Sequence, residues 1–412
     1  MTISSITTED KRFELKEGEG ADSVHSDPVY SYAVTYLHTD SGTTGIGITF
    51  NLGAGTDLIC QAIELLSRDL IGKDIEELMA NFGEVSHRLA NHPQLRWLGP
   101  QKGVVHLAQA SIVNACFDLW AKQRGKPLWK LLIDLKPEAV VSLLDFAWVD
   151  DVLDKSEALE ILQQAKTGKQ ERAGVLESGY PGYDTSVGWF NYSDELIAEN
   201  TRRAIDNGFS AMKLKVGSDD PSRDIRRATL IREITGDQAT IMLDANQKWS
   251  LGEAIRNGRE FQAMNPYWIE EPMHPDDVLA HAELARELSP TAIALGEHVS
   301  HAVLFKNFMQ AKAMQFCQVD CTRVGGVNEF ILVSLMAKKF GLKVVPHVGD
   351  MGQIHQHLVL FNHISLGLEK IFLEYIPHLR DYFEFPARVE EGVYRAPDDV
   401  GASCDFCCQR KN

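Results

Sequence analysis

The stretch from residue 211 to residue 297 decides the fold, because short apolar segments recur in it at a regular interval. Each segment ends at or next to a charged residue and is followed by a helical pattern. Strands that alternate with helices predict a parallel sheet, since parallel strands need crossover connections. The segments are AMKLKV at 211–216, TIMLD at 240–244, YWIE at 267–270 and IALGE at 293–297.

The same pattern extends in both directions along the chain. Eight strands separated by helices predict an α/β fold, a (β/α)7β barrel of the TIM type over residues 139–380. The stretch 150–195 is too long for one connection, and its part at 179–186 (GYPGYDTS) predicts a loop over the active site. The further predicted strands are VVSLLDF at 140–146, FCQVD at 316–320, KVVPH at 343–347 and IFLE at 371–374.

Residues 1–138 follow a different pattern. Apolar and polar residues alternate over 29–50, which predicts a meander of strands, and apolar residues at three- and four-residue steps then predict helices at 57–72, 75–90 and 103–123. This is an α+β domain. Residues 381–412 leave the barrel pattern, and we expect them to return to the first domain.

Composition excludes several classes of partner. The 412 residues carry a net charge of -17 without a Lys/Arg-rich run, which argues against nucleic acid and anionic membranes as partners. No apolar stretch is expected to reach the roughly 18 residues that a membrane span needs, the N-terminus lacks the pattern of a signal peptide, and seven scattered cysteines are typical of a reducing compartment. We therefore expect a cytoplasmic protein whose partner is a small molecule.

Seven ionisable residues stand at the ends of the predicted strands, 23 to 29 residues apart: Lys215, Asp244, Glu270, Glu297, Asp320, His347 and Glu374. A single acid at such a position is most often a loop residue or a helix cap. The common spacing favours a different interpretation, because one strand and one helix of a barrel have about this length. All seven side chains are then predicted to meet at the catalytic rim.

Three of these residues form a predicted metal site. Asp244, Glu270 and Glu297 follow three consecutive strands, and three facing carboxylates require a cation. Oxygen ligands favour one Mg²⁺. Alternation along the strand allows either Glu270 or Glu271 to point inward; we choose Glu270 and keep Glu271 as a supporting residue.

Two lysines and a histidine are candidates for acid–base chemistry. Lys213 and Lys215 lie on one face of a strand, and two adjacent ammonium groups beside a metal lower each other's pKa, so a neutral lysine is predicted. Taken alone, Lys-x-Lys is more often a surface pair. Asp320 on the neighbouring strand would fix the imidazole of His347. Glu374, if protonated, could donate a hydrogen bond to a substrate carboxylate.

These groups suit one kind of reaction. A proton next to a carboxylate is too weakly acidic for lysine to remove unless a metal and a neighbouring acid stabilise the product. If the next carbon carries a hydroxyl, a protonated His347 helps to expel it, and the product is a 2-keto-3-deoxy acid. Asn246, which shares strand parity with Asp244, is a candidate for substrate contact, as are Tyr30 and Trp189.

The chain resembles the mandelate racemase branch of the enolase superfamily, which uses Lys or His bases with Mg²⁺, and within it the L-fuconate dehydratases. The short motifs are Lys213-Leu-Lys215, Asp244-Ala-Asn246, WIEEP at 268–272, Gly296-Glu297, Asp320 and His347. The more specific runs are QLRWLGPQKGVVHLA at 94–108, GKPLWKLL at 125–132, YPGYDTSVGWFNYSDE at 180–195, HPDDVLAHA at 274–282 and VDCTRVGGVNE at 319–329.

The resemblance implies a function and a set of roles. The N-terminal domain caps the barrel, Asp244, Glu270 and Glu297 bind Mg²⁺, and Lys215 removes the C2 proton. His347, paired with Asp320, releases the C3 hydroxyl of an acid sugar. A homo-oligomer is also implied.

Some positions depart from the resemblance. Ala54 and Ala302 stand where these relatives carry arginine, and Asp350 is an added acid in the loop after His347. We expect these changes to alter which sugar the pocket accepts. Two alternatives to a dehydratase remain open: a racemase or epimerase that uses the same Lys/His pair, and a barrel without catalytic activity. A Schiff-base aldolase is less favoured, since it would not need three carboxylates.

Overall fold

The computed structural model describes residues 1–99 and 101–407. The chain begins with a three-stranded antiparallel sheet of order β1-β2-β3. Its strands are β1 (Ile3–Phe13), β2 (Tyr30–Thr39) and β3 (Thr44–Asn51). The sequence analysis missed β1, because most of its side chains are polar and only partly buried, so it lacks the apolar alternation that marked the other two.

Helices pack on this sheet, and the longest, α4, makes a very close contact with β3. An added Cβ at Gly47 would lie 2.0 Å from the carbonyl oxygen of Ser111 on α4, so only glycine fits there. The helices of this part of the chain are α1 (Thr56–Leu66), η1 (Arg68–Leu70), α2 (Ile75–Ala80), α3 (Phe82–Ala90), η2 (Pro93–Leu98), α4 (Gly103–Gln123) and α5 (Leu128–Asp134).

α4 is long and apolar enough to cross a membrane by length and composition alone, so the expectation that no segment reaches this length was wrong. However, 89% of its most apolar window is buried inside the protein. The apolar character of α4 is therefore explained by its place between the sheet and the barrel helices.

The barrel consists of eight parallel strands, and a helix follows each of the first seven. This arrangement confirms the predicted (β/α)7β fold. The strands are β4 (Tyr180–Gly188), β5 (Ala211–Lys215), β6 (Thr240–Asp244), β7 (Trp268–Glu270), β8 (Ala292–Leu295), β9 (Phe316–Cys317), β10 (Lys343–Val344) and β11 (Leu373–Tyr375).

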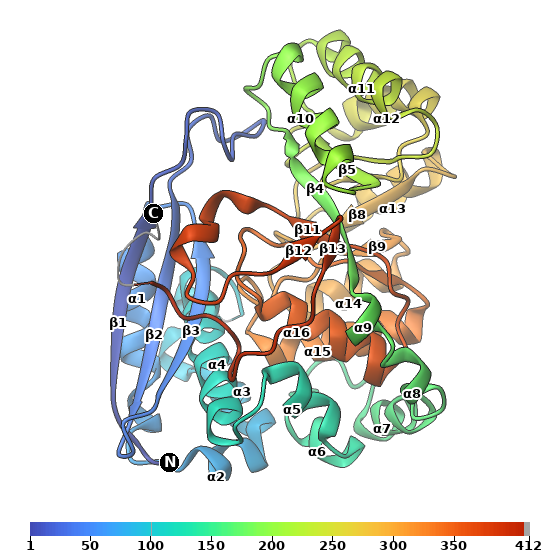
Figure 1. The fold of residues 1–412 in the computed structure, drawn as a ribbon. Coiled ribbons are helices and arrows are strands. Elements are labelled where there is room, and N and C mark those ends of the chain that lie inside the picture. Colours follow the sequence, from blue (N-terminus) through green and yellow to red (C-terminus); the bar gives the residue numbers. More distant parts are fainter. Residues whose placement is uncertain (100, 408–412) are drawn as a thin grey trace.

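The helices lie outside the strands, as Figure 1 shows for α10, α11 and α12 above β4 and β5 and for α14, α15 and α16 on the other side. They are α10 (Asp194–Asp206), α11 (Pro221–Thr235), α12 (Leu251–Phe261), η3 (Gln262–Met264), α13 (Val278–Glu287), α14 (Ala302–Gln310), α15 (Val327–Phe340), α16 (Ile354–Phe361) and η4 (Asn362–Leu366).

The first barrel strand lies elsewhere than predicted. Residues 140–146 belong to α6 (Pro137–Ser142) and the turn after it, and helices α7 (Lys155–Gln164), α8 (Lys169–Arg172) and α9 (Val175–Ser178) follow. The first strand is β4, inside the segment that we predicted as an active-site loop. Its Pro181 and Gly182 are tolerated because this end of β4 pairs with the short strand β13 (Val393–Tyr394), where Gly182 donates to Gly392.

A layer of apolar side chains fills the barrel below the charged rim. Each strand or its immediate extension contributes one buried residue, and the aromatic rings of Trp268 and Phe316 lie 5.0 Å apart at its centre. The layer consists of Tyr183, Ala211, Met242, Trp268, Ala294, Phe316, Val345 and Ile371. The floor of the barrel is thus packed, and the inward-facing lysines and acids lie above it.

The N-terminal sheet, the barrel and the C-terminal segment meet at the barrel mouth. The loop between β1 and β2 reaches from the sheet towards β4 (Figure 1), where Phe190 donates to the carbonyl of Ala21 and Ser23 donates to that of Ala245. After η5 (Pro377–Tyr382) and β12 (Val389–Glu390), the chain runs back to the sheet, and Phe406 contacts Phe13. The boundaries at 138 and 380 stay a prediction.

Glu329 on α15 joins the barrel to the N-terminal helices. Its carboxylate accepts hydrogen bonds from His106 on α4, from Ala302 at the start of α14, and from Gly325. Burial raises the pKa of Glu329, but His106 and the hydrogen bonds outweigh it and bring the pKa to about 2. A carboxylate whose pKa is lowered on folding stabilises the fold above its unfolded pKa of about 4.3, and this contribution is lost as the pH falls towards 2.

We therefore expect Glu329→Gln to lower the free energy of unfolding by about 2 kcal/mol at pH 7 and by clearly less at pH 3. Urea unfolding at the two pH values measures this difference. Exposed Glu233 on α11 offers the control, since Glu233→Gln should change stability by less than about 0.5 kcal/mol at either pH. An equal loss at pH 7 and pH 3 would contradict the assignment.

Candidate active site

A cavity of about 250 Å³ opens at the barrel mouth, between the barrel rim and the N-terminal sheet. Lys213, Asp244, Glu270 and Asp320 lie at or below its floor and are buried. The other predicted site residues line the cavity: Tyr30, Trp189, Lys215, Asn246, Glu297, His347 and Glu374. The strand ends therefore converge as the spacing predicted.

The predicted metal ligands lie close together. Asp244 and Glu270 are paired in register on adjacent strands, and both are fully buried. The Nζ of Lys213 lies 2.8 Å from Glu270 and 3.5 Å from Asp244, so the two acids share one ammonium group. Glu297 lies just past the end of β8, with its Oε2 3.5 Å from Nε2 of His347.

Glu270 alone among these acids has an unmet demand for positive charge. At Asp244 and Glu297 burial raises the pKa, but Lys215 and His347, respectively, outweigh it and the net shift is downward. Burial and the nearby Asp244 together raise the pKa of Glu270 to about 8. The side-chain oxygen of Asn246 is buried and has no hydrogen-bond partner among the described residues. The buried carboxylates of Asp244 and Glu270, the partly exposed carboxylate of Glu297 and an additional oxygen donor fit Mg²⁺, which prefers oxygen ligands.

Glu270, rather than Glu271, points into the barrel. Trp268 donates to Glu270 at 2.9 Å from the same face of β7. Glu271 follows in a left-handed conformation with φ of 39°, and its carboxylate turns to the backbone and imidazole of His298. The alternation along the strand therefore selected the inward residue as predicted.

Carboxylates next to both lysines favour the charged amines, and the predicted neutral lysine, which depends on a neighbouring metal, stays a prediction. Burial lowers the pKa of Lys215, but Asp244, whose Oδ2 lies 2.6 Å from its Nζ, outweighs burial and brings the pKa to about 12. The pKa of Lys213 is likewise raised, because Glu270 and Glu374 outweigh its burial. The sequence analysis weighed one lysine against the other and left out the carboxylates.

His347 and Asp320 form the predicted pair. His347 Nδ1 lies 2.7 Å from Asp320 Oδ2, which leaves Nε2 on the side of the cavity. Burial lowers the pKa of His347, but Glu297 and the bond to Asp320 outweigh it and raise the pKa to about 9. The opposite shift occurs at Asp320: although burial favours its neutral form, its histidine neighbours hold its pKa well below the usual range.

Glu374 could donate to a substrate only if it were protonated, and its surroundings favour the anion. Its Oε1 lies 2.7 Å from Lys213 and accepts from Thr185, and its Oε2 accepts from the backbone of Val348. Burial raises its pKa, but Lys213 outweighs burial and the net shift is downward. Glu374 is therefore an anion that receives hydrogen bonds, and the expected protonated donor is not supported.

Three candidates for substrate contact line the same cavity as Lys215. The indole ring of Trp189 lies 5.4 Å from its Nζ, and the indole nitrogen has no partner among the described residues. Tyr30 enters from β2 of the sheet, and Asn246 is held by its backbone bond to Asp244. Substrate contact by these residues stays a prediction.

The cavity contains further polar residues that the sequence analysis missed: Asp22, His25, Asn51, His298 and Arg323. His298 directly follows Glu297, and Arg323 lies three residues after Asp320 in the run at 319–329, so their proximity to strand ends was a usable signal. Asp22 and His25 come from the loop between β1 and β2, where no periodic pattern marks them.

The positions that depart from the resemblance do not line this cavity in the described part of the chain. Ala302 starts α14 and its backbone donates to Glu329. Asp350 is buried and accepts a hydrogen bond from Tyr32 on β2. The expected direct effect of Ala54, Ala302 and Asp350 on the substrate is therefore not supported by their placement.

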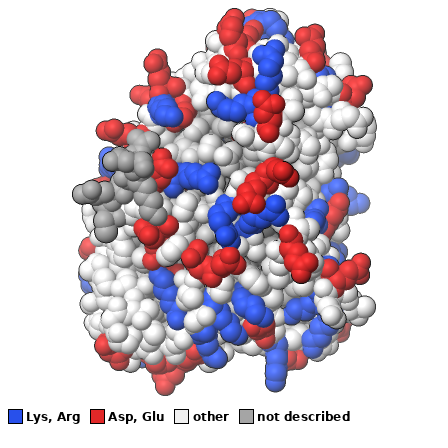
Figure 2. Space-filling view, viewed as in Figure 1, with Lys and Arg blue, Asp and Glu red and all other residues white. Residues whose placement is uncertain are grey.

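The surface offers no extended basic face in the view of Figure 2, where Lys and Arg are intermixed with Asp and Glu. That nucleic acid and membranes are not partners stays a prediction.

The chain is similar in sequence to known proteins. Residues 196–409 match the family model described as Enolase C-terminal domain-like. The chain is 43% identical to human "Mitochondrial enolase superfamily member 1" over 98% of its length and 93% of the relative's. It is 37% identical to L-galactonate dehydratase of Hypocrea jecorina, over 98% of this chain and 92% of that one.

Solved structures agree with these relationships. The crystal structure of human mitochondrial enolase superfamily member 1 matches with a TM-score of 0.95 and 42% identity, over 98% of this chain and 94% of that one. The L-talarate/galactarate dehydratase of Salmonella typhimurium LT2, liganded with Mg and L-lyxarohydroxamate, matches with a TM-score of 0.75 and 25% identity, over 98% and 89%.

Proposed function

The chain belongs to the enolase superfamily, on its mandelate racemase branch, and from this we propose that it is a Mg²⁺-dependent dehydratase of a sugar acid. The product is a 2-keto-3-deoxy acid. The observation that carries the proposal is the placement of Lys215 and His347 on one cavity, beside three carboxylates. Relatives named as sugar-acid dehydratases support it.

Asp244, Glu270 and Glu297 would hold the Mg²⁺, which supplies positive charge next to the substrate carboxylate. With Asp244 engaged in holding the metal, Lys215 would lose its carboxylate partner, which favours its neutral amine. Lys215 then takes the proton from C2. His347, through Nε2, gives a proton to the C3 hydroxyl, which leaves as water, and the resulting enol becomes the 2-keto acid as C3 gains a proton.

The cavity favours an aldonate, which has one carboxylate. The far end of the cavity is formed by the loop from the N-terminal sheet, and Asp22 there carries a carboxylate that is bonded to His25. This anion disfavours a second carboxylate on the substrate and suits the hydroxyls of a neutral sugar tail. The relationship to L-galactonate dehydratase points to six-carbon aldonates, including L-fuconate and L-galactonate.

A panel of aldonates and aldarates tests the proposal. With Mg²⁺ present, at least one aldonate should give a 2-keto-3-deoxy acid, detected with semicarbazide, and aldarates should react at least about tenfold more slowly. Deuterium incorporation at C2 without loss of water would instead assign a racemase or epimerase. Neither keto acid nor exchange with any acid of the panel would indicate a barrel without this activity.

Two broader properties belong to the same proposal. We infer a homo-oligomer from the family resemblance, and sedimentation of the purified chain tests it. A cytoplasmic location also stays a prediction, and relatives with 43% identity are named as mitochondrial. Localisation of a tagged chain distinguishes these two compartments.

A further inference from the structure

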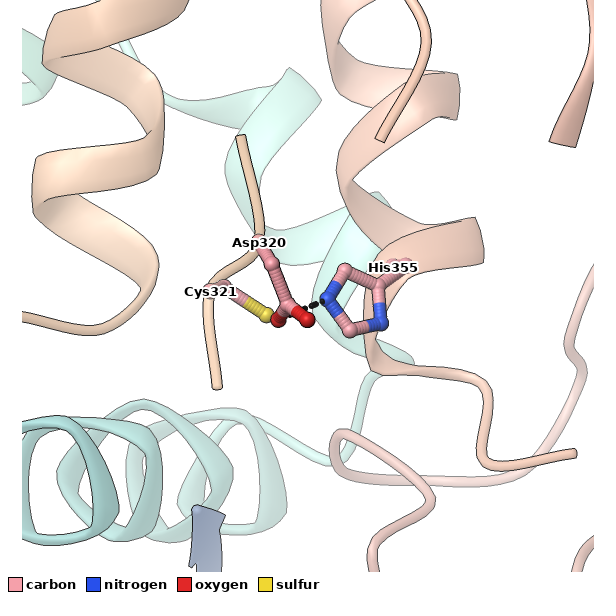
Figure 3. Close-up of side chains that lie close together, drawn as sticks. All are labelled: Asp320, Cys321 and His355. Carbon is pink, nitrogen blue, oxygen red and sulfur yellow. Dashed lines mark hydrogen bonds and ion pairs between the residues drawn. The ribbon is translucent and has the colours of Figure 1, made fainter. Parts of the chain in front are cut away.

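The carboxylate of Asp320 receives hydrogen bonds on both oxygens. Oδ2 accepts from His347, and Oδ1 accepts from Nε2 of His355 at 2.7 Å and from the backbone and hydroxyl of Thr322, each at 2.7 Å. Figure 3 shows the imidazole of His355 directed at this carboxylate from α16. Asp320 is therefore held between two histidines that are eight residues apart in the sequence.

The two histidines lie on either side of one loop. His347 precedes the segment 348–353, and His355 lies just after it at the start of α16. This segment provides the backbone of Val348 to Glu374, the cavity wall at Gly349, and Asp350 to the N-terminal sheet. Asp320 is thus hydrogen-bonded to the residues at both ends of the segment 348–353.

The hydrogen-bond pattern assigns the tautomer of His355. Its Nδ1 is buried and has no partner among the described residues, whereas Nε2 faces an anionic oxygen. A proton on Nε2 satisfies Asp320, and a second proton on Nδ1 would be buried without an acceptor. Nε2 of His355 is therefore the donor to Asp320.

A metal ion at this position is a competing interpretation, because ligand atoms of Asp320, Cys321 and His355 lie within 4.8 Å of one another (Figure 3). However, the distance of 2.7 Å between Asp320 and His355 is that of a direct hydrogen bond. Burial also raises the pKa of the Cys321 thiol well above its usual value, and a protonated thiol is a poor metal ligand. The hydrogen bond accounts for the geometry.

We propose that His355 is a positioning residue for His347: it fixes the Asp320 carboxylate from the side opposite His347 and so keeps Nε2 of His347 directed into the cavity. This inference rests on the proposed dehydratase function. It concerns the expulsion of the C3 hydroxyl and leaves the removal of the C2 proton to Lys215, which does not contact Asp320.

The two half-reactions provide the test. In D2O, the dehydration rate reports on His347, and incorporation of deuterium at C2 of recovered substrate reports on Lys215. For His355→Leu with saturating Mg²⁺, we expect kcat for keto-acid formation to fall about 30-fold, with KM changed less than threefold. Deuterium incorporation should stay within about threefold of the wild type or rise. It rises if the intermediate formed by loss of the C2 proton returns to substrate more often because loss of the C3 hydroxyl is slower.

Rescue and a matched control separate positioning from general packing. His355→Gln can donate from its amide at a similar reach, and we expect it to recover at least about tenfold of the lost kcat. His357→Leu is the control: His357 is buried on the same helix, but it accepts a hydrogen bond from Trp129 and does not contact Asp320. This variant should lose thermal stability and keep kcat within about threefold.

Several outcomes would overturn the inference: full kcat in His355→Leu, an equal loss of dehydration and exchange, or no recovery in His355→Gln. If His355→Leu does not fold, His355→Asn takes its place, since this shorter amide does not reach Asp320, and its comparison with His355→Gln decides in the same way. Failure of the proposed function is recognised separately, because the wild type would then form no keto acid.

Discussion

Lys215→Ala is expected to lower kcat for keto-acid formation by at least about 10³-fold. The reason is geometric: Lys215 lines the cavity and ends β5 at the rim, while Lys213 lies below it with only 1% of its side chain exposed. Removal of the Lys215 amine leaves no base at C2. Deuterium incorporation at C2 should fall by the same factor as dehydration, in contrast to the effect expected for His355→Leu.

Lys338→Ala provides the control for this experiment, since Lys338 is exposed on α15 and donates only to a backbone carbonyl of Gly367 in the described contacts. Its kcat should match the wild type within about twofold. If Lys215→Ala is folded, binds Mg²⁺ and still exchanges the C2 proton at the wild-type rate, then Lys215 is not the base.

Asp244→Asn is expected to weaken Mg²⁺ binding by at least about 100-fold and to abolish dehydration at millimolar Mg²⁺. Asp244 lies between both lysines and Glu270, so this change removes one ligand charge and also leaves Lys215 without its carboxylate partner. Calorimetric titration with Mg²⁺ measures the affinity directly, without reference to turnover. In the wild type, Mg²⁺ at 100 times Kd should add about 2.7 kcal/mol to the free energy of unfolding.

The stabilisation by Mg²⁺ should disappear in Asp244→Asn and persist in Asp219→Asn. Asp219 is a suitable comparison because its side chain is 95% exposed and pairs only loosely with Lys248 at 3.4 Å. EDTA should remove the activity of the wild type, and added Mg²⁺ should restore it. Equal Mg²⁺ affinity in Asp244→Asn and the wild type would rule out this residue as a ligand.

The regular spacing of strand ends made most of the barrel predictable. Inward and outward residues alternate on a strand, so Ala211, Lys213 and Lys215 share one face, and the same rule placed Trp268 and Glu270 together. The convergence of the acids followed from this register. It required no knowledge of side-chain contacts.

The first barrel strand could not be identified by the same rule. Residues 140–146 are short, apolar and rich in valine and leucine, and such a run does not distinguish a strand from a buried helix. In α6, Val140 is buried on one face of the helix, with Leu143 and Leu144 following in the turn. The first strand is β4, and its Pro181 and Gly182 indicated a loop because these residues are uncommon inside strands. Pairing of this end of β4 with β13 accommodates them.

Contacts between residues far apart in the sequence were the other part of the site that could not be predicted. His355 lies on α16, a helix that is buried on all sides, so no amphipathic pattern indicates where its side chain points. The pKa values of the lysines depend on how many carboxylates surround them. Neither the direction of the His355 side chain nor the number of carboxylates around each lysine can be known before the strands and helices are placed next to one another.

The packed floor of the barrel has a consequence for the order of events in turnover. Trp268, Phe316 and their neighbours close the lower end, so the substrate and the product share a single passage at the upper end. The loop bearing Asp22 and Ser23 lies at that passage, where Asp22 lines the cavity and Ser23 donates to the carbonyl of Ala245. Departure of the keto acid must therefore precede the next arrival, because both take the same route.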